Sequence, residues 1–360
     1  MKRVLPVLLV IPLLILAIGC SDDDNPTNSG GGGTVEFADT TVFLSGSGVW
    51  QTTLDGSSYD QPAYFSFSEA IAGTPKAAVT NWDISFERTN INLNGGASSQ
   101  NGGTVTGADL GAVDYAAVTA DDTTGATWED DALYLVINEW YIYNPGTHSL
   151  NMTRNVYSML DASGQHYLKF QIDSLVDAGQ PPSMGTVWLT YYYQPVANST
   201  DLSGAVQTAS INVGAGTGYF DFSSGQQVTP ADPSTSTNWD LAFSSYDVMQ
   251  NCGPNGPGEC AAFPAYGELT DPTDIAAYTA QPAAAPMFPD FIKSVFVRDL
   301  YDDTQNWYDY NSETHTITSR GHVYAIKVAD KVYKLRIESY YANIGGVPTS
   351  GHFTFIWNEL

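Results

Sequence analysis

The chain has 360 residues, and 13 Lys and Arg stand against 39 Asp and Glu, so its formal net charge at pH 7 is -26. Such an acidic surface repels the phosphates of DNA and RNA, which excludes nucleic acid as an expected partner. The length suits two domains of ordinary size, each with its own core.

The first nineteen residues have the organisation of an export signal. Lys2 and Arg3 precede an uncharged run over 4–18, and Gly19 stands before Cys20. The run is shorter than the roughly 20 apolar residues that a membrane-spanning helix needs. A cysteine at the cleavage point predicts a lipoprotein, in which Cys20 is acylated and becomes the mature N-terminus. An ordinary signal peptide with an incidental cysteine is the alternative.

Residues 20–34 are predicted to form a flexible tether. Three aspartates, Asp22 to Asp24, are followed by a Gly-rich run over 29–33, a composition typical of flexible linkers. The acidic triplet resembles the surface-export signal of Bacteroidota lipoproteins, which implies the outer face of the outer membrane. A solvated spacer is the alternative.

One strand pattern occurs twice in the chain. Asn81-Trp82-Asp83-Ile84-Ser85-Phe86 returns as Asn238-Trp239-Asp240-Leu241-Ala242-Phe243, and the alternation of apolar and polar residues predicts a half-buried strand. Further landmarks repeat in the same order: 63–68 with 218–223, 114–117 with 274–277, Trp140 to His148 with Trp307 to His315, Val156-Tyr157 with Val323-Tyr324, and Tyr167-Leu168-Lys169 with Tyr333-Lys334-Leu335. The order indicates a tandem duplication, with domains at 35–195 and 205–360 and a linker at 196–204.

Both repeats are predicted to be all-β. Their segments are short, rich in Tyr, Thr, Val, Phe and Trp, and separated by Gly, Asn and Asp, which favours an antiparallel sandwich or a partly open barrel. Asn94-Gly95-Gly96 is expected to form a hairpin turn after the first Trp-Asp strand. The prolines within 263–289 exclude a central strand and predict a surface loop.

These motifs carry a family resemblance. A Tyr-Phe-Ser-Phe-Ser segment at 64–68, then the Asn-Trp-Asp strand, an Asn-Gly turn, a Trp-led strand, a Val-Tyr strand and a final aromatic strand together resemble the HmuY family. Those are exported lipoproteins of Bacteroidota with an all-β fold, and their best-known members bind haem. The resemblance implies capture of haem or another porphyrin at the cell surface. The partners it implies are host or environmental haemoproteins, or an outer-membrane receptor.

The resemblance makes His148 and His315 the candidate axial ligands of haem. They occupy the same place in the two repeats, eight residues after Trp140 and Trp307. The family's ligand position, five residues after the Trp, falls here on Pro145 and Ser312. The interval from Tyr115 to Trp140 is also too short for the segment that carries a second ligand. Histidines without a ligand, in a turn or on the surface, are the alternative.

Methionine replaces histidine as the ligand in some relatives, so five methionines are further candidates: Met152, Met159, Met184, Met249 and Met287. None recurs at its partner position in the other repeat. Met152 and Met159 are typical of packing on a strand face. Met287, in the Pro-rich loop, fits a core position least.

Cys252 and Cys260 lie in one Gly/Pro-rich loop. In an exported protein such a pair predicts a disulfide, worth about 2 kcal/mol for so short a loop. A metal site would need further ligands, and the His and Cys spacings supply none.

Catalytic motifs are lacking, so no enzymatic activity is expected. The chain has no HExxH, GxSxG or P-loop pattern. Asp83 and Asp240 are expected to accept hydrogen bonds from backbone amides rather than to act as acid and base.

Exposed aromatic residues suggest an alternative function. Tyr141, Tyr143, Tyr308 and Tyr310, or the run at 191–193, could stack on a glycan or another planar ligand. Core and cross-strand packing is the other interpretation. The alternative function is therefore a non-catalytic surface interaction or glycan-binding module that has lost the haem ligands.

Overall fold

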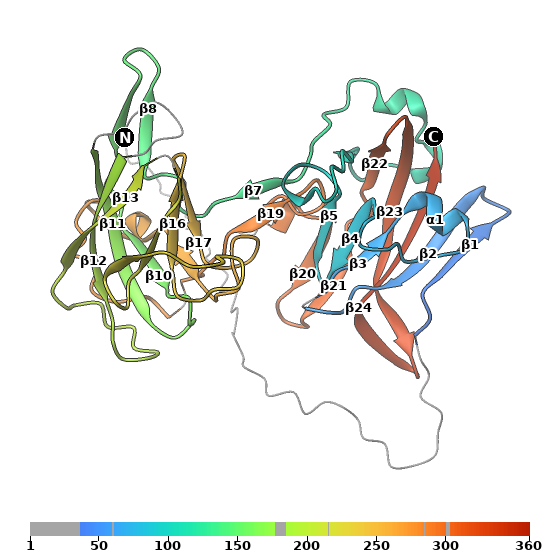
Figure 1. The fold of residues 1–360 in the computed structure, drawn as a ribbon. Coiled ribbons are helices and arrows are strands. Elements are labelled where there is room, and N and C mark those ends of the chain that lie inside the picture. The colour runs from blue at the N-terminus through green and yellow to red at the C-terminus, as the bar shows by residue number, and fades with distance from the viewer. Residues whose placement is uncertain (1–36, 60, 177–184, 215, 284, 300–302) are drawn as a thin grey trace, which may run out of the picture. The chain divides into compact units, whose positions relative to one another are not determined.

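The computed structural model describes residues 37–59, 61–176, 185–214, 216–283, 285–299 and 303–360. Regular structure in these ranges is almost entirely antiparallel β-strand, so the predicted all-β class is confirmed (Figure 1). The predicted export signal and tether, with Cys20, and Met184 lie outside the described residues. A search of the described ranges finds no helix with the length and apolar character needed to cross a membrane.

The chain divides into two compact units, and neither unit is one of the repeats. The central unit is Tyr134–Phe291. The split unit consists of the described residues up to Leu133 together with Ile292–Leu360. The boundaries expected from the repeats, 35–195 and 205–360, therefore differ from those of the compact units. The physical reason is that the first half of each repeat packs with the second half of the other.

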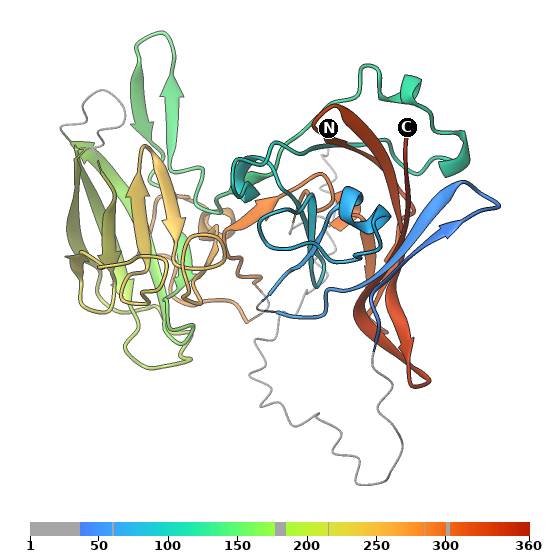
Figure 2. The ribbon, with the colours of Figure 1, turned by 45° about the vertical axis from the view of Figure 1, so that its right-hand side comes forward.

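The split unit contains a six-stranded sheet in the order β1-β2-β24-β23-β22-β6 and a three-stranded sheet β3-β4-β5. In Figures 1 and 2 the blue strands of the first repeat lie beside the red strands of the second. Its elements are β1 (Thr40–Leu44), β2 (Val49–Asp55), β3 (Ala63–Phe65), α1 (Phe67–Ile71), β4 (Ile84–Glu87), β5 (Asn90–Leu93), β6 (Thr106–Asp109), β20 (Tyr308–Asn311), β21 (Thr316–Ser319), β22 (Val323–Val328), β23 (Lys331–Ile344) and β24 (Val347–Glu359).

The central unit contains a five-stranded sheet in the order β13-β12-β11-β10-β18, a four-stranded sheet β15-β14-β16-β17, and the hairpin β8–β9. The chain passes between the units in β7 (Ala132–Tyr134) and β19 (Phe291–Lys293), which pair with each other. Its strands are β8 (Tyr141–Asn144), β9 (Ser149–Met152), β10 (Tyr157–Leu160), β11 (Tyr167–Val176), β12 (Gly185–Tyr193), β13 (Gln207–Gly214), β14 (Gly218–Asp221), β15 (Gln226–Val228), β16 (Leu241–Ser244), β17 (Asp247–Gln250) and β18 (Ala261–Phe263).

The exchange of halves is reciprocal. Strand β22 of the second repeat pairs with β6 of the first, and β10 of the first pairs with β18 of the second. The two Trp-led strands follow the same rule: Trp140 Nε1 donates to Tyr246 O at 3.2 Å, and Trp307 Nε1 donates to Thr89 O at 2.9 Å. The two repeats carry the same donor and acceptor groups. Each Trp can therefore make the same hydrogen bond with a carbonyl of the other repeat.

Two buried lysines make equivalent contacts across the exchanged halves. Lys169 Nζ donates to the carbonyls of Ile275 at 2.9 Å and Tyr278 at 2.6 Å. Lys334 Nζ donates to the carbonyls of Tyr115 and Val118, each at 2.8 Å. The sequence match of the two repeats aligned Lys169 with Leu335. These contacts show that Lys334 is the counterpart of Lys169, so the alignment of this strand shifts by one residue. Each ammonium fixes a tight turn whose carbonyls would otherwise be buried without partners.

The Trp-Asp strands lie in the cores, but they are buried on both faces rather than half-buried as predicted, because Ser85 and Ala242 on the second face are buried too. Trp82, Ile84 and Phe86 are buried, and so are Trp239 and Leu241. In the split unit the core combines the two repeats, and Phe65 and Phe86 pack against Phe355 with ring centroids 5.1 and 5.2 Å apart. Burial of these aromatic rings supplies much of the apolar stabilisation.

The predicted turn at Asn94-Gly95-Gly96 is wrong. Strands β4 and β5 have only four residues each, so their turn falls at Arg88 and Thr89, where Arg88 has a φ of 51°. Asn94 is instead a buried link: its Nδ2 donates to Trp82 O at 2.9 Å, and its Oδ1 accepts from Gln100 N at 2.8 Å.

Candidate functional site

His148 and His315 occupy the turns of two matching hairpins, β8–β9 and β20–β21. Both side chains are exposed, and their φ angles are 51° and 55°, in the left-handed region that few residue types adopt. The turns close in the same way: the Oδ1 of Asn144 accepts from Gly146 N at 2.9 Å, and the Oδ1 of Asn311 accepts from Glu313 N at 2.9 Å. Pro145 and Ser312, at the family's ligand position, are exposed in these turns.

Each histidine is held by a tyrosine of its own hairpin. His148 Nδ1 lies 2.7 Å from Tyr143 Oη, and His315 Nδ1 lies 2.7 Å from Tyr310 Oη. When Nδ1–H donates to the phenolic oxygen, Nε2 carries the lone pair and is available as a metal ligand. The tyrosine and the histidine have the same spacing in both repeats, and this spacing is the sequence signal for the pairing.

Each hairpin presents a single imidazole. The register of β8–β9 sets Tyr143 against Leu150 and Tyr141 against Met152, so these four side chains share one face. Three or more His, Cys, Asp or Glu side chains grouped as for a bare metal ion are not found among the described residues. The donor set of each hairpin is therefore one imidazole, the number of protein ligands that one axial position of a haem would take.

The other described methionines are placed in or near the cores. Met159 is fully buried in β10, whereas Met152 and Met249 are half-buried on strands. Met287, which the Pro-rich sequence fitted least to a core position, packs against a core cluster of the central unit.

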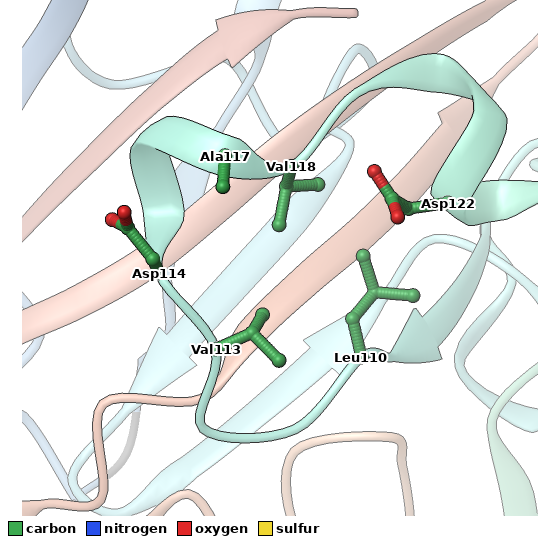
Figure 3. A pocket seen from close by; sticks show the side chains of 6 residues that line it. All are labelled: Leu110, Val113, Asp114, Ala117, Val118 and Asp122. Carbon is green, nitrogen blue, oxygen red and sulfur yellow. The ribbon is translucent and has the colours of Figure 1, made fainter.

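A small cavity of about 240 Å³ lies in the loop that follows β6 (Figure 3). Its apolar lining is Leu110, Val113, Ala117 and Val118, and Asp114 and Asp122 stand at its rim. Its volume falls below the usual range for drug-sized ligands. Hydrogen bonds from the Thr119 backbone and side chain, at 2.7 and 2.9 Å, lower the pKa of Asp122. That carboxylate stabilises its own loop, and the cavity is too small for a porphyrin.

Cys252 and Cys260 are both buried, and both are free cysteines in the structure. Cys260 Sγ contacts Asp240 O at 3.5 Å, and Cys260 N donates to Asn251 O at 3.2 Å. Burial raises the pKa of both thiols. Each sulfur is thus accommodated in its reduced form, and a bond between them stays a prediction.

The carboxylates of half-buried Asp83 and buried Asp240 accept hydrogen bonds from backbone amides, as expected. Asp83 accepts from Phe67 N at 2.8 Å, and Asp240 accepts from Phe222 N and from Ala162 N, both at 2.7 Å. Burial raises the pKa of Asp240 to about 7. Each of these hydrogen bonds joins a Trp-Asp strand to the backbone of another segment, so the two carboxylates have a structural role.

A second pair of buried carboxylates was missed by the sequence analysis. Asp131 accepts from Leu93 N at 2.8 Å, and Asp290 accepts from Gln250 N at 2.7 Å. Burial raises the pKa of Asp131 to about 7. No local pattern marks these residues, because their partners lie far away in the sequence.

A protein-family model described as HmuY protein matches residues 58–143 and 216–357, which together exceed half of the chain. The chain belongs to the HmuY family. The first matched segment ends at Tyr143, before the turn with His148, whereas the second includes His315. A search of curated proteins finds no match. Membership in the HmuY family agrees with the all-β fold and with the presence of two related regions.

Proposed function

We propose that this protein captures haem, or another porphyrin, at the cell surface and has no catalytic activity. The supporting observation is the Tyr–His pair on an exposed hairpin, which occurs in both repeats of a chain of the HmuY family. A neutral imidazole is a common axial ligand of haem iron. Bound haem would supply the iron and the planar apolar ring. The chain's own part is to hold the imidazole in one orientation and to offer aromatic surface beside it.

The location belongs to the same proposal. Acylation of Cys20 would attach the chain to the outer membrane, where host or environmental haemoproteins or an outer-membrane receptor could exchange haem with it. In a Cys20→Ser variant the protein should leave the membrane fraction and appear in the soluble fraction. Continued membrane attachment of the variant would refute the lipid anchor.

Haemin titration of the mature chain, residues 20–360, tests the binding. We expect a shifted Soret band that weakens in the double variant His148→Ala, His315→Ala. His166→Ala is a control, because His166 lies outside both hairpins, is half-buried and stacks on Tyr193 with ring centroids 5.3 Å apart; that variant should keep the wild-type spectrum. An unshifted Soret band with the wild-type chain sinks the haem proposal.

A glycan-binding or other surface-interaction module is the second candidate function. It is favoured by the exposed side chains of Ile142 and Tyr143, which are 63% and 49% exposed. Binding to a glycan that is lost in Tyr143→Ala, in a protein that leaves the haemin spectrum unshifted, would select this function instead.

A further inference from the structure

We infer that haem binding is confined to one of the two hairpins, β8–β9, with His148 as the ligand, and that β20–β21 has become a purely structural hairpin. This inference rests on the proposed function. The hairpins share a backbone, a turn and a Tyr–His pair, but their surfaces differ in charge and in exposure.

The first difference is charge. No Asp, Glu, Lys or Arg stands between Glu139 and Arg154, so the β8–β9 hairpin carries no carboxylate, ammonium or guanidinium group. In β20–β21 the position of Gly146 is taken by Glu313, in the turn that holds His315. The position of Ile142 is taken by Asp309, which lies on the strand face opposite Tyr310 and pairs with Arg320 at 2.5 Å. Haem carries two propionate groups, so carboxylates on the hairpin repel it, and their burial under an apolar ring is unfavourable.

The second difference is exposure of the aromatic face. In β20–β21, Tyr308 and Ile317 pack against the core of the split unit. The amide of Ile317 donates to Tyr341 Oη at 3.0 Å, and Ser319 Oγ donates to Ile337 O at 2.6 Å. These contacts attach the hairpin to β23, so its apolar face is already used by the fold.

The β8–β9 hairpin leaves more of its surface to solvent. Tyr143 is exposed, whereas its counterpart Tyr310 is half-buried. In Figures 1 and 2 the hairpin extends beyond the other strands of the central unit. An uncharged apolar surface beside an available imidazole nitrogen suits a flat apolar ring, because binding then removes apolar area from water without burying a charge.

Single-site variants of the mature chain test which hairpin binds. Haemin titration of the wild type should give one haemin per chain. The shifted Soret band should disappear in His148→Ala and persist unchanged in His315→Ala. A wild-type stoichiometry of two, or loss of the band in His315→Ala, would overturn the inference and leave the proposed function standing. No Soret shift in the wild type would refute both.

Exchange of the surface residues tests the cause. Gly146→Glu should weaken haemin binding at least tenfold, and Glu313→Gly should gain a second haemin that is lost again when His315→Ala is added. Circular dichroism on heating checks that each variant remains folded. Unchanged affinity in folded Gly146→Glu, or no second site in folded Glu313→Gly, contradicts the inference.

Discussion

Single buried aspartates are expected to make the stability of the fold depend on pH. Asp131 and Asp240 lie in the two units, accept backbone amides, and have a pKa that burial raises to about 7. An aspartate in the unfolded chain has a pKa near 4. Each folded carboxyl group therefore retains a proton that the unfolded chain releases between about pH 4 and pH 7.

This difference predicts a pH-dependent stability. Because the folded pKa lies above the unfolded one, the contribution is fully present below about pH 4 and is lost as pH rises toward 7. The free energy of unfolding should fall in this window by up to about 1.4 kcal/mol per pH unit for each group. Asp131→Asn keeps an acceptor for the Leu93 amide but cannot titrate, so urea unfolding across this range should show a shallower slope. The variant Asp121→Asn, at an exposed position, should retain the wild-type slope, and equal slopes in all three proteins would contradict the prediction.

Sequence reasoning succeeded where a residue's role is set by its near neighbours. Asp83 and Asp240 follow a Trp at the start of a strand, and their amide contacts were expected from that position. Asp131 has its partner at Leu93, on another element, so nothing near it in the sequence marks its role. The pairing of His148 with Tyr143 was predictable in part. The repeat shows the equal spacing of the two residues, but it does not show the hydrogen bond between them.

At the scale of elements, the turns that follow β6 and β18 depend on lysines from strands of the other repeat. Lys334 reaches the turn that contains Tyr115, and Lys169 reaches the turn that contains Ile275. Strand periodicity predicted such strands, but it treats a lysine as a solvent-facing residue. The carbonyls that hold these lysines are supplied by a distant segment, which sequence periodicity does not reveal.

Removal of one ammonium should destabilise its unit. Lys334→Met keeps an unbranched apolar side chain but leaves the carbonyls of Tyr115 and Val118 without their donor. We expect a loss of about 2 kcal/mol, since each buried unpaired polar group costs about 1 to 3 kcal/mol. Urea unfolding followed by tryptophan fluorescence measures it. Lys327→Met, at an exposed position of β22, is the control, and an equal effect of the two variants would refute the role of the buried ammonium.

At the scale of the whole molecule, the duplication was predictable but the partnership of the halves was not. Every landmark of the Trp-Asp repeat is present in order, so the sequence identifies two copies of one fold. Both copies, however, carry the same pairing surfaces. Within one repeat β10 could pair with β6, and β22 could pair with β18. The structure instead has the pairs β22–β6 and β10–β18, which join the two repeats. Local pattern is identical for both outcomes, and therefore it could not predict the boundary at Tyr134 and Phe291.

The exchange predicts which fragment folds alone. A polypeptide of residues 134–291 contains the whole central unit and should unfold cooperatively with dispersed amide resonances. Residues 37–133 alone should remain unfolded, because strands β22, β23 and β24 are missing from them. Random-coil spectra from the 134–291 fragment would show that the unit does not fold independently.

The same connectivity has a consequence for the gene. Because the chain leaves the split unit at Leu133 and returns at Ile292, one in-frame deletion of the intervening codons would join the first half of one copy to the second half of the other. The product would have about the length and the element order of one repeat, and it would keep every strand of the six-stranded and three-stranded sheets of the split unit. The central unit thus stands in the gene as a removable insert, and recombination could convert this two-domain protein into a one-domain protein in one event.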